Sequence, residues 1–247
     1  MTAQRHGAIR FASRGSGAWV GHLLVACIVA TALGCAGAAQ GAPAQASATA
    51  DVGCLADAMP TSLDATQTWT PEHTACREDP VACTPRCEQG DATACYAIGV
   101  GLQQLGRGAE GEQMFARACR GGSAIGCTNY GAGLLGEAAD GMDAPAVCAA
   151  RIFERTCAAG ERLWGCGMWG MVLANGEGVS ADPARALEVL ERACALTEHF
   201  ACDVLGSAHR RGVFGEPSAA AAREAYARGC RGGYTQSCEA LEALGAP

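Results

Sequence analysis

The sequence contains no lysine, because all 18 of its fixed positive side chains are arginines. This absence excludes Schiff-base catalysis and any Ser-x-x-Lys nucleophile pair. Aromatic residues are also scarce, at 5%, whereas apolar residues make up 49% with much alanine among them. Many small side chains, few rings and 34 glycines favour short helices joined by tight turns over a β-sandwich.

Positive charge is scarce in most of the chain. Residues 51–247 hold all 25 acidic residues and fifteen of the arginines, a formal charge of −10, whereas the whole chain carries −7. A body with this charge repels nucleic acid, which binds basic surfaces. We therefore expect no nucleic-acid partner.

The first 50 residues have the pattern of an export signal. Residues 1–17 carry three arginines and no acidic residue, and the apolar run Leu23–Leu33 follows. A basic region, a short apolar run and then small residues are typical of a secretory signal peptide, and a membrane span would need ~20 apolar residues. We expect a signal peptide over residues 1–35 and a flexible linker rich in Ala, Gly, Ser and Pro over residues 36–53.

Two cleavage patterns compete at the end of this signal. Residues 32–35, Ala-Leu-Gly-Cys, resemble a bacterial lipobox, although Leu33 lies one position closer to the cysteine than usual. Cleavage there would leave Cys35 lipidated and predicts an outer-membrane lipoprotein. Residues 36–38, Ala-Gly-Ala, fit ordinary signal peptidase and predict a periplasmic, cell-surface or secreted protein. Both patterns predict export to a compartment where paired thiols oxidise.

Cysteine spacing shows an internal repeat. Five cysteines are separated by 32, 38, 37 and 36 residues, and each has a second cysteine eight or nine positions later. The repeat reads Cys-x-x-Gly-x-x-x-x-Cys, with Thr197 in place of glycine in the fourth repeat. We predict one disulfide in each repeat, between the following cysteines: Cys87–Cys95, Cys119–Cys127, Cys157–Cys166, Cys194–Cys202 and Cys230–Cys238.

Other positions align on the same register. Large apolar residues stand one helical turn before the later first cysteines: Phe115, Phe153, Leu190 and Tyr226. Residues four apart share a helical face, so each first cysteine is expected to end a helix and each second cysteine to open the next. Glycine in the turn would take the left-handed conformation. Each disulfide would then join two successive helices, for roughly 2.5 kcal/mol of stability.

The third repeat carries the clearest family pattern. Residues 169–190 read Trp-Gly-x-x-Leu-x-x-Gly-x-Gly-Val-x-x-Asp-x-x-x-Ala-x-x-x-Leu and resemble the Sel-one-like repeat, a relative of the tetratricopeptide repeat. The cysteine pattern resembles the cysteine-rich, secreted Hcp-like branch of that family. The resemblance covers residues 79–245 and implies an all-α, disulfide-stapled α/α solenoid, a TPR-like superhelix. We expect a capping segment over residues 54–94, then about four repeats and a C-terminal capping helix over residues 95–247.

Four cysteines lie outside the repeat and stay unassigned: Cys54, Cys76, Cys83 and Cys148. They allow three pairings, and the sequence does not choose among them. Cys83 and Cys87 are four apart on an expected helix, which is poor geometry for a bond between them. Cys148 is distant in sequence from the other three, so it could also be a free thiol or bond to another chain.

The resemblance implies a non-catalytic scaffold or adaptor that binds a protein or peptide outside the cytoplasm. Some Hcp-like relatives are described as binding penicillin or weakly hydrolysing β-lactams, so such a hydrolase is the alternative. A purely structural surface lipoprotein is a third hypothesis. We expect no catalytic residue, cofactor or metal, since Cys-x-x-Cys is absent and disulfides account for the cysteines.

Two weaker candidates remain. His199 and His209 flank Cys202 and could face each other across a turn. The densest basic positions could hold an anion: Arg210, Arg211, Arg223, Arg228 and Arg231.

Overall fold

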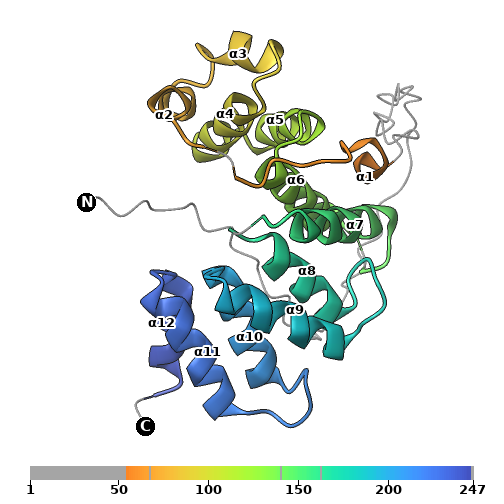
Figure 1. The fold of residues 1–247 in the computed structure, drawn as a ribbon, viewed down its shortest axis with the longest axis vertical. Coiled ribbons are helices and arrows are strands. Elements are labelled where there is room, and N and C mark those ends of the chain that lie inside the picture. Colours follow the sequence, from red (N-terminus) through yellow and green to blue (C-terminus); the bar gives the residue numbers. More distant parts are fainter. Residues whose placement is uncertain (1–53, 67, 140, 162, 246–247) are drawn as a thin grey trace, which may run out of the picture. The chain divides into compact units, whose positions relative to one another are not determined.

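The computed structural model describes residues 54–245 except residues 67, 140 and 162. These residues form twelve helices (Figure 1): α1 (Leu55–Ala58), α2 (Pro71–Glu78), α3 (Thr84–Glu88), α4 (Ala92–Gln104), α5 (Gly108–Arg120), α6 (Ala124–Glu137), α7 (Ala144–Ala158), α8 (Gly165–Asn175), α9 (Pro183–Ala195), α10 (His199–Arg211), α11 (Ala219–Arg231) and α12 (Thr235–Ala243). No β-strand occurs among them, and one isolated parallel bridge joins Asp64 and Ser123. The predicted all-α class is confirmed.

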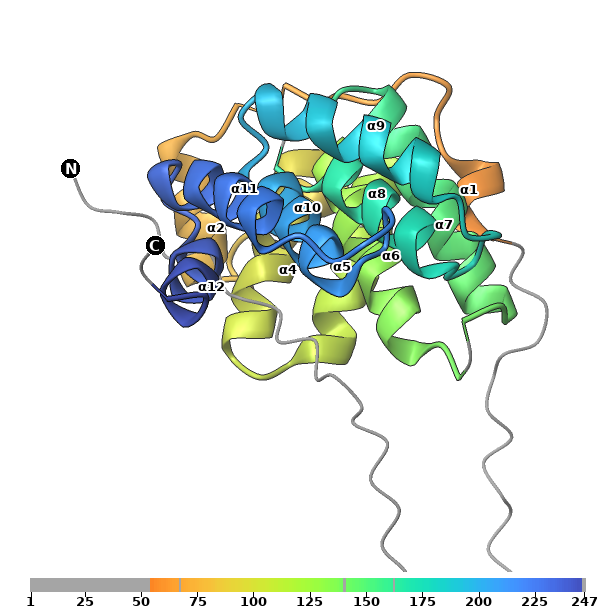
Figure 2. The same cartoon turned by 90° about the horizontal axis from the view of Figure 1, so that it is seen from below.

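The helices stack in chain order. From α4 to α12 each helix packs on the next, and the alternate helices α4, α6, α8, α10 and α12 also contact one another in sequence. Figure 1 and Figure 2 show this succession of helix pairs. The predicted α/α solenoid is therefore confirmed. Within the described residues, no helix combines the length and apolar character that crossing a membrane requires.

At each repeat a large apolar side chain packs against a glycine. The apolar residue one turn before a first cysteine packs onto a glycine of the preceding helix: Phe115 on Gly99, Phe153 on Gly131, Leu190 on Gly170 and Tyr226 on Gly206. A Cβ added at any of these glycines would lie less than 3.0 Å from the facing side chain, closer than real Cβ atoms come. The two helices of each pair can therefore approach closely, and this close packing stabilises a core that contains few aromatic residues.

The turns between repeats adopt one backbone conformation. The glycine three residues after each first cysteine has positive φ: Gly90 (95°), Gly122 (90°), Gly160 (84°) and Gly233 (88°). In the fourth repeat Thr197 takes this position with φ 71°, the only non-glycine residue with positive φ in the described part of the chain. The backbone of the repeat thus persists where its glycine is missing, at a cost in strain.

Short polar side chains begin several helices. Asp182 accepts a hydrogen bond from the amide of Arg185, as expected of an N-cap that precedes Pro183. Helix α9 begins directly after this cap, at Pro183. Asp91 and Ser123 cap α4 and α6 in the same way.

The residues before the repeats contact the helix stack at two places. Helix α2 packs on α4, whereas α1 packs on α5 and α7 of the following repeats. The helix expected through Cys83 begins only at Thr84, and Cys83 is its N-cap residue. Pro85 explains this start, because proline is tolerated only in the first turn of a helix.

Candidate functional site

A disulfide closes each of the five turns that contain the repeated cysteine pair, and we number these turns in chain order from the first (Cys87–Cys95) to the fifth (Cys230–Cys238). The Cα–Cα distances are 4.7 Å for Cys87–Cys95, 4.3 Å for Cys119–Cys127, 4.4 Å for Cys157–Cys166, 4.7 Å for Cys194–Cys202 and 4.6 Å for Cys230–Cys238. In each pair the first cysteine lies on the last turn of one helix and the second on the first turn of the next. The turns are thus covalently fixed, and the residues around them have defined positions.

The four unassigned cysteines form two further disulfides. Cys76 bonds to Cys83 with a Cα–Cα distance of 5.1 Å, and Cys54 bonds to Cys148 with a distance of 5.4 Å. Cys148, for which the sequence left a free thiol or an intermolecular bond open, is therefore bonded within the chain. Its bond ties residue 54 to helix α7, 94 residues away in sequence.

Residues 54–64, which we call the docked segment, lie on the second turn and on α7. Leu55, Ala56 and Met59 are buried in one apolar cluster with residues of α5, α6 and α7. The backbone of Asp64 continues the contact. Its amide donates to the carbonyl of Gly122 (2.8 Å), and its carbonyl accepts from the amide of Ala124, the first residue of α6 (3.0 Å). The solenoid therefore already holds one peptide segment against its helices and turns.

An arginine of α7 holds the backbone of the docked segment. The guanidinium of Arg155 donates to three carbonyls, those of Ala56 (2.6 Å), Met59 (3.4 Å) and Pro60 (2.6 Å). One helical turn earlier, Arg151 forms an ion pair with Asp57. Backbone carbonyls and one carboxylate of the docked segment are thus bound by two arginines.

The same arginine position recurs two residues before the first cysteine of four repeats: Arg117, Arg155, Arg192 and Arg228. Arg192 lies 3.8 Å from Glu188 on its own helix, and the Nε of Arg228 is buried without a hydrogen-bond partner. Arg117 is exposed and has no side-chain hydrogen bond or ion pair within the described residues. Sequence reasoning missed this position, although its constant spacing from the cysteines was a usable signal.

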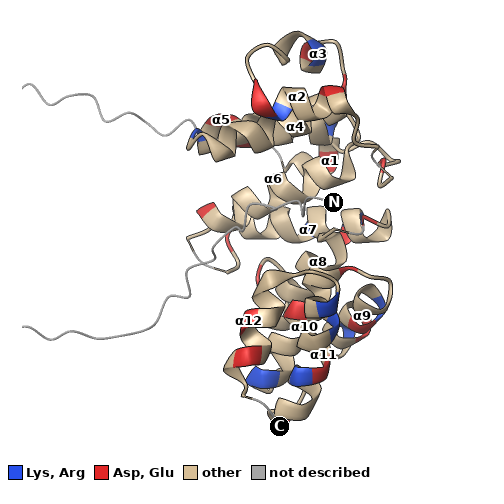
Figure 3. Cartoon of the chain, turned by 90° about the vertical axis from the view of Figure 1, so that its left-hand side faces the viewer, with Lys and Arg blue, Asp and Glu red and all other residues tan. Residues whose placement is uncertain are grey.

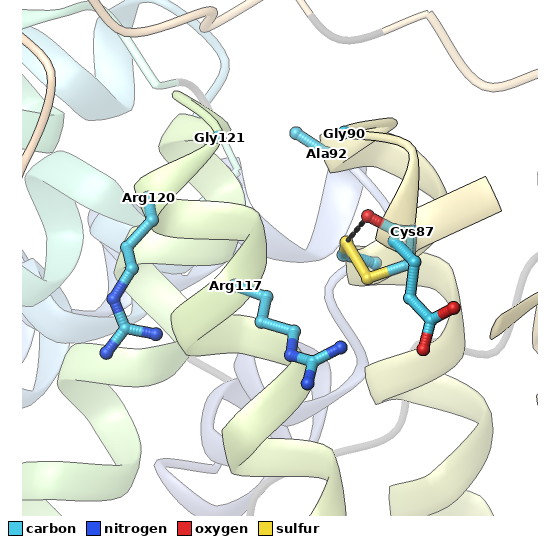
Figure 4. A pocket seen from close by; sticks show the side chains of 8 residues that line it. Cys87, Gly90, Ala92, Arg117, Arg120 and Gly121 are labelled. Carbon is cyan, nitrogen blue, oxygen red and sulfur yellow. Dashed lines mark hydrogen bonds between the residues drawn. A yellow bond between two sulfur atoms is a disulfide. The ribbon is translucent and has the colours of Figure 1, made fainter. Parts of the chain in front are cut away.

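A pocket of about 350 Å³ lies beside the first turn, between this turn and α5. We call it the first-turn pocket, and it is lined by Cys87, Glu88, Gly90, Ala92, Cys95, Arg117, Arg120 and Gly121. Figure 4 shows both arginine side chains extending from α5, on the side of the pocket opposite Cys87 and Gly90. Gly121 allows the approach of the two sides, because a Cβ there would lie 2.8 Å from the Cβ of Ala92.

The carboxylate of Asp91, a residue next to the pocket in sequence, already has partners within the chain. Asp91 caps α4 through one carboxylate oxygen, and the other accepts from Arg86 at 2.7 Å. Burial raises the pKa of Asp91, but the hydrogen bonds from Ala94 and Arg86 lower it below its ordinary value, so this carboxylate stays ionised. Acidic and basic residues are mixed along the helices (Figure 3).

Two buried carboxyl groups and one half-buried carboxyl group connect later repeats. Thr128 on α6 donates to Glu161 at 3.2 Å, the amide of Gly167 on α8 donates to Glu198, and Ser237 on α12 donates to Asp203 on α10 at 2.9 Å. Burial raises the pKa of Glu198 to about 8, with a further rise from nearby Glu161. Burial likewise raises the pKa of Glu161 and Asp203. These groups therefore join repeats as hydrogen-bond acceptors.

The two histidines that the sequence suggested as neighbours do not lie close to each other. His199 and His209 lie at opposite ends of α10, which places them about 15 Å apart along the helix axis. Within the described residues, no group of three or more metal-ligating side chains is close enough to hold an ion. Of the basic candidates, Arg223 donates to the carbonyls of Leu244 and Gly245, and Arg211 donates to Asn175.

Comparison with known proteins supports the fold. No family model matches the chain, and no curated protein matches it. The solved structure of a Sel1 repeat protein from Oxalobacter formigenes is similar, with a TM-score of 0.53 and 17% identity over 72% of this chain and 82% of the other. The molecule therefore has the helical repeat fold of a Sel1 repeat protein, the class to which the residues of the third repeat pointed.

Proposed function

We propose that this chain is an exported, non-catalytic repeat protein that acts as a scaffold for a protein or peptide partner, and that it belongs to the cysteine-rich Hcp-like branch. The observation that supports this function most is the docked segment. Its backbone is bound by a turn and by Arg155, and its apolar side chains enter a cluster formed by three helices. A surface that binds peptide backbone in this way suits recognition of other polypeptides.

The compartment follows from the sulfur chemistry. Seven disulfides join all fourteen cysteines of the described residues, and such bonds persist in oxidising environments outside the cytoplasm. We infer export through a signal at residues 1–35, with lipidation of Cys35 as the proposed membrane attachment and residues 36–53 as the linker to it. These residues lie outside the described part of the chain.

The division of the chain is proposed as follows. A capping segment spans residues 54–94, and about four repeats with a C-terminal capping helix span residues 95–247. Stacked repeats of this kind present neighbouring turns and helices in a fixed order, which gives a partner several contacts at once.

Partner capture tests the function. The oxidised chain is immobilised and exposed to cell-envelope extract, and the control is the same chain after reduction and alkylation of every cysteine. We expect a protein that is enriched only on the oxidised chain and that binds it again when both are purified. If the purified candidate binds both forms equally, or if nothing is enriched, the scaffold function is wrong.

A further inference from the structure

We propose that the first-turn pocket binds an acidic peptide segment of a partner protein, and that it holds this peptide as the second turn holds the docked segment. The inference rests on the proposed scaffold function and names the site and the chemistry of its ligand.

The two sites are equivalent in the repeat. Gly90 and Gly122 each stand three residues after a first cysteine, and Ala92 and Ala124 each stand five after it. Arg117 corresponds to Arg155, since each precedes the next first cysteine by two residues. The first-turn pocket is thus the position at which the docked segment would lie if it were moved back by one repeat.

The equivalent groups are used at the second turn. The carbonyl of Gly122 accepts from the backbone of Asp64, the amide of Ala124 donates to it, and Arg155 donates to three carbonyls. A Cβ added at Gly122 would lie 3.8 Å from the carbonyl oxygen of Ser62, a residue of the docked segment. These contacts at the turn and at Arg155 are made to the main chain of the segment, and they do not depend on the peptide's sequence.

The same groups are unused at the first turn. Within the described residues, the carbonyl of Gly90, the amide of Ala92 and the guanidinium of Arg117 have no hydrogen bond. A Cβ added at Gly90 would meet nothing within 4 Å. The pocket of about 350 Å³ occupies this space, and its volume falls in the range of natural ligand pockets. A polypeptide backbone supplies the carbonyls and amides that these groups need.

The preference for acidic residues comes from the charges that differ between the two sites. Arg120 adds a second guanidinium to the pocket, whereas the corresponding residue of the next repeat is Ala158. Neither pocket arginine has an acidic partner within the described residues, whereas Arg151 at the second site binds Asp57. An Asp or Glu of the peptide would satisfy Arg120, since guanidinium binds carboxylate through paired hydrogen bonds. Glu88, on the other wall, can accept from a backbone amide.

The probe for this site is the sequence of the docked segment itself. A fluorescein-labelled peptide of residues 55–66, Leu-Ala-Asp-Ala-Met-Pro-Thr-Ser-Leu-Asp-Ala-Thr, is titrated with the oxidised full chain at low salt, and fluorescence anisotropy is measured. The pocket variant is Arg117→Ala with Arg120→Ala. The matched control is Arg107→Ala with Arg185→Ala, which removes the same charge from two exposed arginines that lie outside the pocket and outside the other basic candidates.

We expect saturable binding that the pocket variant weakens at least tenfold and the control variant changes less than twofold. A peptide with both Asp residues changed to Asn is expected to bind about tenfold more weakly, because it loses a charge-assisted hydrogen bond to the pocket arginines. A tenfold change in affinity corresponds to about 1.4 kcal/mol. Thermal melting of each variant shows that the fold is intact, which is expected because all four arginines are exposed.

Three results would overturn the proposal: no binding, equal weakening by both variants, or binding that ignores the change from Asp to Asn. The captured partner separates this failure from failure of the scaffold function. If that partner binds the pocket variant as tightly as the unchanged chain, the scaffold function stands and the site lies elsewhere.

Discussion

The first and second turns share one backbone and one disulfide geometry, but they differ in what covers them. At the second turn the docked segment is bound by Arg155 and anchored by the bond between Cys54 and Cys148. At the first turn Arg117 is exposed beside an open pocket. Of two turns with equivalent groups, this chain therefore covers one with its own residues and leaves the other open.

The largest effect is expected from releasing the docked segment. In the variant Cys54→Ser with Cys148→Ser, the lost bond no longer closes a loop with a sequence separation of 94. Chain entropy predicts a loss of roughly 4–5 kcal/mol in the free energy of unfolding. Urea unfolding of the oxidised protein measures this loss.

The control for that variant is the short bond of the first turn. Changing Cys87 and Cys95 to Ser opens a separation of 8 residues, for a loss of about 2.5 kcal/mol. If the two double variants lose equal stability, the docked segment is not held as the structure shows.

The fourth turn extends the comparison to pH. Asp91 and Glu198 both stand four residues after a first cysteine, but the pKa of Asp91 is lowered, whereas burial raises that of Glu198 to about 8. The contribution of Glu198 is complete below its unfolded pKa of about 4.5 and is lost as the pH rises to about 8. We expect the free energy of unfolding to fall by roughly 4 kcal/mol across this range.

The variant Glu198→Gln isolates this contribution, because other raised groups such as Glu161 act in the same direction. Its stability between pH 5 and 8 is expected to change less than that of the unchanged chain. Asp91→Asn should instead lose stability at neutral pH, since the ionised Asp91 caps α4 and binds Arg86. Parallel pH profiles for the unchanged chain and Glu198→Gln would contradict the burial of this group.

The smallest expected effect comes from removing the equivalent arginines of the two turns, Arg155 and Arg117. Arg155→Ala leaves three carbonyls of the docked segment without their donor, so we expect a loss of about 2 kcal/mol in chemical unfolding. Arg117→Ala removes an exposed side chain and should change stability by less than about 0.5 kcal/mol. Equal losses would show that the first turn is not open.

The parts of the fold that depend on local spacing could be predicted from the sequence. The period of the cysteines fixed the helix boundaries, and the glycine of each turn predicted its positive φ, which even Thr197 adopts. The position of the docked segment could not be predicted, because its contact with α7 is made across 94 residues. The start of α3 at Thr84 also differed, since Pro85 is tolerated only in the first turn and so prevents the helix from beginning earlier.

The candidate site was predictable only in part. The disulfide that lines the first-turn pocket follows from the repeat. The difference between the exposed Arg117 and the hydrogen-bonded Arg155 does not, because it depends on tertiary contacts. One of two equivalent positions is covered by a distant segment, and a repeat pattern carries no information about such coverage. Burial of Glu198 was equally hidden, because its partner Gly167 belongs to the preceding repeat.

Non-reducing peptide mapping of the protein purified without reductant from the cells that produce it tests the disulfide-closed turns, since alkylation before digestion labels every open thiol. We expect seven disulfide-linked peptide pairs, including Cys54 with Cys148 and Cys76 with Cys83, and no label from Cys54 onward. Labelling of both cysteines of any turn, such as Cys119 and Cys127, would contradict both the covalently closed turns and the oxidising compartment.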